Sequence, residues 1–567
     1  MLAAGDARSP RPLRTAMRPS YSRLRTLLTT ALLVLVAAAG ARAQENRLPD
    51  IGSSAGSVLG PVQQAEYGRM MLAQLRHYGY VLEDPLTEAW LQSTGNRLAA
   101  VSDDPEQRFT FFMMKDRSIN AFATLGGYIG MNAGLVLAAE QEDEVAAVLG
   151  HEIAHVTQAH VLRSVERAQR DSIPILLAML GAIAIAQSAG GNSSDDAAMA
   201  AIASAQGLAA QRQINYTRSN ESEADRIGIR TLARGGYEPE AMASMFERMQ
   251  AVSRTNQGGE RERLPDYLKT HPVTTTRISE AKDRASRLGG STVTGSVSTP
   301  DATRTQRVRI DGATVPDILR VSDNPLLPST LTLLAGLDSG ESREFGWARE
   351  RLRVLSANTP DAAVREYELI ARAAPLDDAQ RYGLAVAQLR AGRGEQAVAG
   401  LAGLLDRHPG DLWITLALAE AEAHAGRAAA ADRRFEGLLE RMPRNPAVAL
   451  TYADVLVARN TPEAGRRAQE VLRPLLNSSS DDPAFQRTFA RASEIAGDPV
   501  RAGESWAEAA FLSGREEQAL VQLTTLRKRE DLDYYARARI DARIARITPV
   551  VLELRRQGLR DPDLRRH

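Results

Sequence analysis

One pentapeptide limits what this chain can fold into: H-E-I-A-H at 151–155, inside a run predicted to be helical over 142–170. Residues four apart lie on one face of an α-helix, so His151 and His155 can grip one metal ion. Imidazole suits zinc, and a catalytic zinc site needs three protein ligands and one open position. Glu152 would stand beside that position as general base. The alternative is a surface helix with two solvated histidines.

Composition sets the class of protein. A chain of 567 residues exceeds one ordinary domain, so two or three are expected. Its 44% apolar and 25% charged residues are ordinary for a globular protein with a sizeable core. A formal net charge of zero argues against nucleic acid as the main partner. Because there is no cysteine, stability must come from packing rather than from disulfides.

The first 43 residues have the layout of a secretory signal peptide. Several arginines precede an apolar run over 27–39, and A-R-A at 41–43 supplies a small-x-small cleavage pattern. Met17 is a second candidate start. The alternative, a membrane anchor, would need a longer apolar run. We therefore expect removal of 1–43, a flexible leader over 44–60, and a soluble protein in a bacterial envelope space.

The segment over 61–288 is predicted to form one domain around the pentapeptide. Two helices are expected over 61–100, a strand over 108–114 and a hairpin over 119–131. A strand at the edge of this sheet, beside the motif helix, would pair with an extended substrate backbone. A stretch rich in Gly, Ser and Thr then opens a linker or insertion over 289–344.

A second charged motif lies downstream on a predicted helix, where Glu221 and Asp225 share one face. Glu221 would be the third zinc ligand. Asp225 would accept a hydrogen bond from the outer nitrogen of His151 or of His155 and so fix its tautomer. Glu223 points to the other side of the helix and is expected to face solvent.

Two further histidines lie near this site in the sequence. His271 precedes Pro272 in a predicted loop, where it would donate to an oxyanion or occupy the open zinc position. The alternative is a loop histidine that the proline holds in place. His160, five residues after His155, is expected either to contact the ligands or to be solvated.

Two apolar runs, 173–186 and 197–210, follow the motif helix and flank a polar turn. Each has about 14 residues, short of the ~20 needed to cross a bilayer. We expect a helical hairpin that covers the active site or makes peripheral contact with a membrane surface. Core helices and a true membrane span are the alternatives.

The last part of the chain, 345–567, is predicted to be helical with an internal repeat. An Ala-Gly pair at 391–392 recurs at 425–426, and Pro409 recurs as Pro443, each 34 residues on. This period is typical of tetratricopeptide repeats, which stack into a solenoid that binds peptides or partner proteins. The alternative is a generic helical bundle.

Residues 61–285 resemble the zinc endopeptidase family that includes the CaaX prenyl protease, the OMA-type mitochondrial proteases and HtpX. The matching pieces are N-A-F-A at 120–123, G-G-Y-I at 126–129, H-E-I-A-H at 151–155, E-S-E-A-D at 221–225, and T-H-P at 270–272 with Arg277. With the signal peptide and the repeats, the chain over about 60–560 is similar to the periplasmic members that enhance β-barrel assembly. Two helical segments, 348–355 and 538–543, are similar to that group too, whereas 290–340 departs from its pattern.

The resemblance implies a role for each motif residue. Zinc, one ion per chain, would be bound by His151, His155 and Glu221, with Glu152 as the base, Asp225 orienting a ligand histidine, and His271 gating or polarising the site. The implied fold is mainly α, an HExxH zincin-type metalloprotease domain with a small β-sheet, followed by an α-solenoid of tetratricopeptide repeats.

The implied function is quality control of outer-membrane β-barrel proteins. The protein would assist their assembly in the periplasm, free or peripheral to the outer membrane, and degrade misfolded or stalled ones. Its repeats would dock to the barrel assembly machinery. One rival hypothesis is a non-proteolytic scaffold or chaperone whose zinc site is structural. Another is a membrane-embedded protease with spans within 173–210.

Overall fold

The computed structural model describes residues 59–167, 217–255, 267, 271–289, 292–299, 302–309 and 343–556. Residues Val58–His567 form one unit. The predicted signal peptide, nearly all of the leader and the apolar runs between 173 and 210 lie outside the described residues. Among the helices that are described, none combines the length and apolarity needed to span a bilayer.

Two helices open the described chain, as predicted. Both α2 (Pro61–His77) and α3 (Pro85–Ala99) begin with a proline, which suits the first turn because an N–H there would have no helical partner. Asp84 caps α3 by accepting a hydrogen bond from the N–H of Thr87 at 3.0 Å. The cap sets where α3 begins.

A three-stranded sheet follows, and the predicted strand and hairpin are confirmed. The strands are β1 (Thr110–Met114), β2 (Ala121–Ala123) and β3 (Tyr128–Asn132). Their order is β1-β3-β2, with β3 parallel to β1 and antiparallel to β2. The turn into β3 requires glycine, because Gly127 has φ of 81° and a Cβ there would lie 2.1 Å from the carbonyl oxygen of Arg108.

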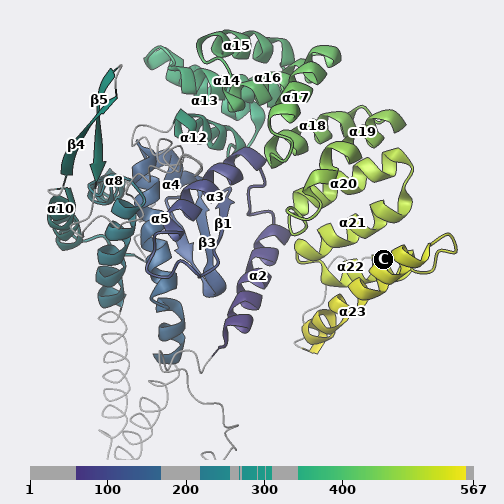
Figure 1. The fold of residues 1–567 in the computed structure, drawn as a ribbon, viewed down its shortest axis with the longest axis horizontal. Helices are drawn as coiled ribbons and strands as arrows, with labels where there is room; N and C mark the ends of the chain where they lie inside the picture. The colour runs from purple at the N-terminus through teal and green to yellow at the C-terminus, as the bar shows by residue number, and fades with distance from the viewer. Residues whose placement is uncertain are drawn as a thin grey trace, which may run out of the picture. The chain divides into compact units, whose positions relative to one another are not determined.

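The motif helix lies in the core of this domain. A short helix, α4 (Ala133–Ala138), leads into α5 (Glu142–Thr157), which packs against α3 and β2 and is seen beside the sheet in Figure 1. The predicted continuous helix to residue 170 is wrong. α5 ends at Thr157, Ala159 takes the left-handed conformation with φ of 52°, and the chain becomes helical again over 160–167.

A second helix, 217–234, which we call the returning helix, crosses α5 at the pentapeptide. Two glycines permit the crossing. A Cβ on Gly228 would lie 3.0 Å from the N and Cα of His151, and a Cβ on Gly150 would lie 3.1 Å from the Gly228 carbonyl oxygen. The two backbones are therefore in contact where H-E-I-A-H lies.

Two more helices complete the domain, and a hairpin follows it. α8 (Ala241–Thr255) packs on α5 and on α10 (Thr275–Gly289). Beyond α10, β4 (Thr292–Thr299) and β5 (Ala302–Arg309) form an antiparallel hairpin. Part of the stretch whose composition predicted a linker is thus paired as strands.

The C-terminal part is helical, as predicted, from α12 (Arg343–Leu355) to α23 (Tyr534–Arg556). The helices between them are α13 (Pro360–Ala373), α14 (Asp378–Arg390), α15 (Gly394–Arg407), α16 (Leu412–His424), α17 (Ala428–Arg441), α18 (Pro446–Ala458), α19 (Pro462–Leu472), η5 (Arg473–Leu475), α20 (Pro483–Ala496), α21 (Pro499–Leu512) and α22 (Glu516–Leu526). Successive helices pack on each other (Figure 1).

The helix starts reproduce the spacing read from the sequence. α14, α16 and α18 begin at Asp378, Leu412 and Pro446, which are 34 residues apart. The turns inside two of the pairs use Gly392 and Gly426, with φ of 76° and 78°. From α20 onward the spacing drifts, as expected. The assignment of these pairs as tetratricopeptide repeats stays a prediction.

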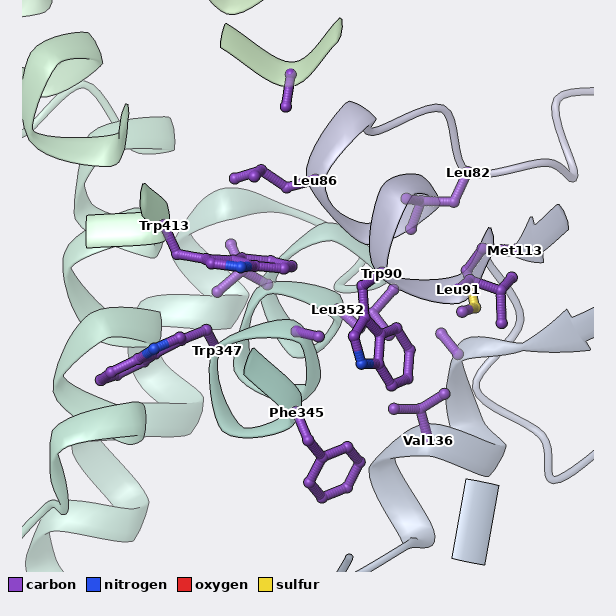
Figure 2. Close-up of a cluster of buried hydrophobic side chains, with 14 of the residues drawn as sticks. Leu82, Leu86, Trp90, Leu91, Met113, Val136, Phe345, Trp347, Leu352 and Trp413 are labelled. Atoms are coloured by element: carbon purple, nitrogen blue, oxygen red, sulfur yellow. The ribbon is translucent and has the colours of Figure 1, made fainter. Parts of the chain in front are cut away.

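One hydrophobic core joins the part of the chain that carries H-E-I-A-H to the C-terminal helices (Figure 2). α12 packs against α3 and α4 on one side and against α14 on the other. The rings of Trp90 and Phe345 lie 6.2 Å apart across this junction. Beside them, Arg351 donates to both carboxylate oxygens of Asp84 over 2.7–3.0 Å. The residue that caps α3 therefore also anchors α12.

Candidate metal centre

Four side chains from three separate segments converge between α5 and the returning helix. α5 supplies His151 and His155, the returning helix supplies Glu221, and the segment before α10 supplies His271. Each places one candidate ligand atom within 4.8 Å of the others. His151, His155 and Glu221 are buried, and the side chain of His271 is 12% exposed. The structure thus brings together the two histidines and the carboxylate singled out from the sequence.

The spacing of these atoms fits a single zinc ion. The Nε2 atoms of His151 and His155 lie 3.0 Å apart, and each lies 3.4 Å from an oxygen of Glu221. Ligands placed 2.0–2.1 Å from a tetrahedral zinc are about 3.3–3.4 Å from one another. Two imidazoles and a carboxylate are also the donor set of many catalytic zinc sites.

His271 lies outside the helices and strands, as predicted for a loop, and beside these side chains. Its Nδ1 is 3.0 and 3.1 Å from the two oxygens of Glu221 and 3.4 Å from the Nε2 of His151. Its ring stacks on Tyr267 at 4.7 Å, and its backbone N–H donates to the Tyr267 carbonyl at 2.7 Å. Four ligand atoms, not three, therefore surround the same point.

Glu152 presents a carboxylate to this centre. Its side chain is 1% exposed, and its Oε1 has no hydrogen-bond partner among the described residues. The Nε2 of His271 is 3.8 Å away. A buried carboxylate oxygen without a partner is costly unless water or a ligand donates to it. This position is therefore fitted to accept a proton from a molecule bound between the ligands.

Asp225 and Arg277 contact two of these candidate ligands, His151 and Glu221, on the side away from the centre. Oδ1 of Asp225 lies 3.0 Å from the Nδ1 of His151. The sequence left open whether Asp225 faces His151 or His155, and the structure shows that it faces His151. Both oxygens of Asp225 accept hydrogen bonds from Arg277 at 2.7 Å. Arg277 also lies 2.9 Å from Glu221. The sequence drew attention to Arg277 only as part of a family motif, without its contacts.

The electrostatics favour positive charge at the centre. Burial alone would lower the pKa of His151, but Asp225 and Glu221 raise it to about 10. Burial would raise the pKa of Glu221, but His151 and His271 hold it below its usual range. Burial and the neighbouring His151 lower the pKa of His155 well below its usual value. A divalent cation would satisfy the carboxylates in place of a proton.

A further pair lies behind His155. The Nδ1 of His160 is 2.9 Å from the Nδ1 of His155, and its Nε2 is 3.1 Å from Glu223. The expectation that Glu223 faces solvent is therefore only partly right, because its carboxylate contacts His160 and Arg163. The break at Ala159 turns His160 back toward α5, and no residue type in the sequence marks that break.

The two glycines at the helix crossing were also missed, although the sequence contained a signal. Asp225 and Gly228 follow Glu221 at the i+4 and i+7 positions, which lie on one helix face. A glycine on the face that carries the carboxylates indicates a close approach of another backbone. Gly150, next to His151, is the matching position on α5.

Comparison with known proteins points to one group. Residues 85–285 match the model described as peptidase family M48. A putative beta-barrel assembly-enhancing protease of Vibrio cholerae is 41% identical over 261 residues, which are 46% of this chain and 52% of that protein. The beta-barrel assembly-enhancing protease of Yersinia pestis is 30% identical over 92% of this chain and 96% of its own length. That of Escherichia coli K12 is 28% identical over 92% and 94%.

Proposed function

Because this chain belongs to peptidase family M48, within its group of beta-barrel assembly-enhancing proteases, we propose that it is a zinc-dependent endopeptidase that assists the assembly of outer-membrane β-barrel proteins and degrades those that misassemble. The observation that carries the proposal is the convergence of two helix-borne imidazoles and a carboxylate beside the unpartnered oxygen of Glu152. The names of the relatives support the substrate class.

We propose that His151, His155 and Glu221 bind the zinc. When bound, zinc supplies a Lewis acid that polarises a peptide carbonyl. Glu152 would take a proton from the attacking water at its free oxygen and return it to the leaving amine. Such a base typically contributes about 10²–10⁴-fold to the rate.

His271 would restrain this activity. Its Nδ1 lies at hydrogen-bond distance from Glu221 and close to His151, in the place of a fourth ligand. A catalytic zinc site needs that place for water and substrate. His271 must therefore move away before a peptide is cut, and in its present position it keeps the site closed.

The edge of the sheet would bind the substrate backbone. Asn132 donates to Asn120, and Thr124 to Tyr128, across the β2–β3 pair. Since bonding to one neighbour alternates along an antiparallel strand, the backbone groups of Ala121 and Ala123 point away from β3. β2 packs against α5, so an extended peptide added at this edge would pass beside the ligands.

We also propose the location and partners. The N-terminal signal peptide would send the protein to the periplasm, free or peripheral to the outer membrane. The C-terminal helices would dock to the barrel assembly machinery as tetratricopeptide repeats. The rival hypothesis of a non-proteolytic scaffold is not favoured, because the chain belongs to a peptidase family. The membrane-embedded hypothesis depends on 173–210, which lie outside the described residues.

The test compares three forms of the mature chain: wild type, Glu152→Gln and His271→Ala. Bound zinc and cleavage of an unfolded outer-membrane β-barrel protein are measured on each. Glu152→Gln should retain zinc and lose cleavage by at least about 10²-fold, because the general base is gone. His271→Ala should cleave faster than wild type. Wild-type cleavage by Glu152→Gln would refute the catalytic assignment, and slower cleavage by His271→Ala would refute the restraint.

A further inference from the structure

The two ligand histidines are supported in different ways on the side facing away from the centre. The outer nitrogen of His151 faces a carboxylate, Asp225, at 3.0 Å. The outer nitrogen of His155 faces another imidazole instead, the Nδ1 of His160 at 2.9 Å. His160 is 2% exposed, and its other nitrogen lies 3.1 Å from Glu223.

Only one arrangement of protons satisfies these contacts when zinc is present. The Nε2 of His155 faces the other ligand atoms, so it must offer its lone pair to the metal. A neutral imidazole then carries its proton on Nδ1, and His155 donates to the Nδ1 of His160. His160, accepting at Nδ1, must carry its own proton on Nε2, where the carboxylate of Glu223 accepts it.

The break in the helix after α5 makes these two hydrogen bonds, from His155 to His160 and from His160 to Glu223, possible. On an uninterrupted helix, the residue four positions after His155 would share its face. His160, five positions after it, would point about 100° further round the helix axis. The left-handed Ala159 instead places the ring of His160 against that of His155, with centroids 4.8 Å apart. Glu223 is itself held by Arg163, whose guanidinium also donates to the carbonyl of Gln158 at the break.

We propose that His160 and Glu223 are positioning residues that set the tautomer and orientation of His155 for zinc. This inference rests on the proposed function, because it takes His155 as a ligand through Nε2. His160 touches neither metal nor substrate. Its contribution is an acceptor that keeps the proton of His155 on the outer nitrogen, while Glu223 keeps the proton of His160 on Nε2. Partners of this kind typically contribute about 10–100-fold to metal affinity.

The first experiment measures zinc affinity of the full mature chain by competition with a chromophoric chelator. His160→Leu removes the acceptor and should weaken zinc binding by about 10–100-fold. His160→Asn retains an acceptor oxygen near the position of Nδ1 and should recover most of that loss. Glu223→Ala should weaken binding less than His160→Leu, because the acceptor nitrogen remains.

A matched control is His408→Leu. His408 likewise pairs through its Nε2 with a carboxylate, because it donates to Asp378 at 2.8 Å, but it lies among the C-terminal helices. This variant should bind zinc as the wild type does. Wild-type affinity in His160→Leu, or equal losses in His160→Leu and His160→Asn, would overturn the proposal. Failure of the wild type to bind zinc would instead overturn the proposed function.

The second experiment needs no variant. Histidine labelled with ¹⁵N in the zinc-loaded wild type reports the tautomer of each ring by NMR. His155 should carry its proton on Nδ1 and His160 on Nε2. A His160 with its proton on Nδ1 would overturn the proposal even if every substitution at this position failed to fold.

Discussion

Gly228 and His151 are in backbone contact: a Cβ on Gly228 would lie 3.0 Å from both the N and the Cα of His151. This contact sets the distance between α5, which carries His151 and His155, and the returning helix, which carries Glu221. Glu221 lies two turns before Gly228 on the returning helix. The position of the crossing therefore also determines how far the carboxylate of Glu221 extends toward His151 and His155.

Gly228→Ala should therefore push the two helices apart by a few tenths of an ångström. We expect a loss of about 1–3 kcal/mol in the free energy of unfolding, because the added methyl overpacks a backbone contact. Urea unfolding of the metal-free chain measures it. The control is Gly437→Ala in α17, where a Cβ would meet nothing within 4 Å. That substitution should stabilise the helix by up to about 1 kcal/mol. Unchanged stability in Gly228→Ala would show that the helices separate freely.

Asp225→Asn should weaken zinc binding by about 10–100-fold. The amide keeps the shape of the side chain but offers one acceptor where Arg277 now uses two oxygens. His151 also loses the charge that faces its Nδ1. The measurement is the chelator competition described above.

A suitable control for this change is Asp432→Asn. Asp432 likewise accepts from Arg459 through both oxygens, at 2.6 and 3.0 Å, but on the partly exposed side of α17. Zinc affinity should be unchanged there. Equal affinities for Asp225→Asn and wild type would mean that Asp225 does not support His151.

The contribution of Glu88 in α3 to the free energy of unfolding should fall as pH rises from about 4.5 to about 7. Burial and then the nearby Asp482 raise the pKa of Glu88 from 4.5 to about 7. Because the folded state holds the proton more tightly, this contribution is complete below about pH 4.5, declines as pH rises toward 7 and is lost once pH passes 7.

Glu88→Gln tests this dependence. At pH 8 the variant should be more stable than wild type by on the order of 1–2 kcal/mol, and at pH 4 the two should be similar. Thermal unfolding across this pH range measures the difference. Glu440→Gln, at an exposed position of α17, should show no such trend. Parallel pH profiles for Glu88→Gln and wild type would contradict the assignment.

Gly426→Ala should destabilise the C-terminal helices by about 1 kcal/mol. Gly426 has φ of 78°, and a Cβ there would meet nothing within 4 Å, so the cost is backbone strain alone. Asn460→Gly makes the opposite change at the equivalent turn, where φ is 53°, and should be neutral or slightly stabilising. Chemical unfolding followed by circular dichroism measures both. Equal stabilities for the two variants would mean that these turns tolerate any residue.

Much of the fold was predictable because the signals are local. Helix starts such as Asp84-Pro85, the Gly126-Gly127 turn and the 34-residue spacing of the C-terminal helices depend on a few neighbouring residues. The end of the motif helix was not predictable. Ala159 is an ordinary helix former, and nothing in its residue type indicates the left-handed φ of 52° that it adopts.

The sequence by itself determined which side chains could bind a metal, because the i, i+4 spacing of His151 and His155, and of Glu221 and Asp225, places each pair on one helix face. Only the tertiary structure decided that Asp225 faces His151, that His160 lies against the outer nitrogen of His155 and that His271 lies beside Glu221. Those choices depend on how closely two helices cross and on where a helix breaks. Such properties arise from contacts between residues far apart in the chain, which no local pattern records.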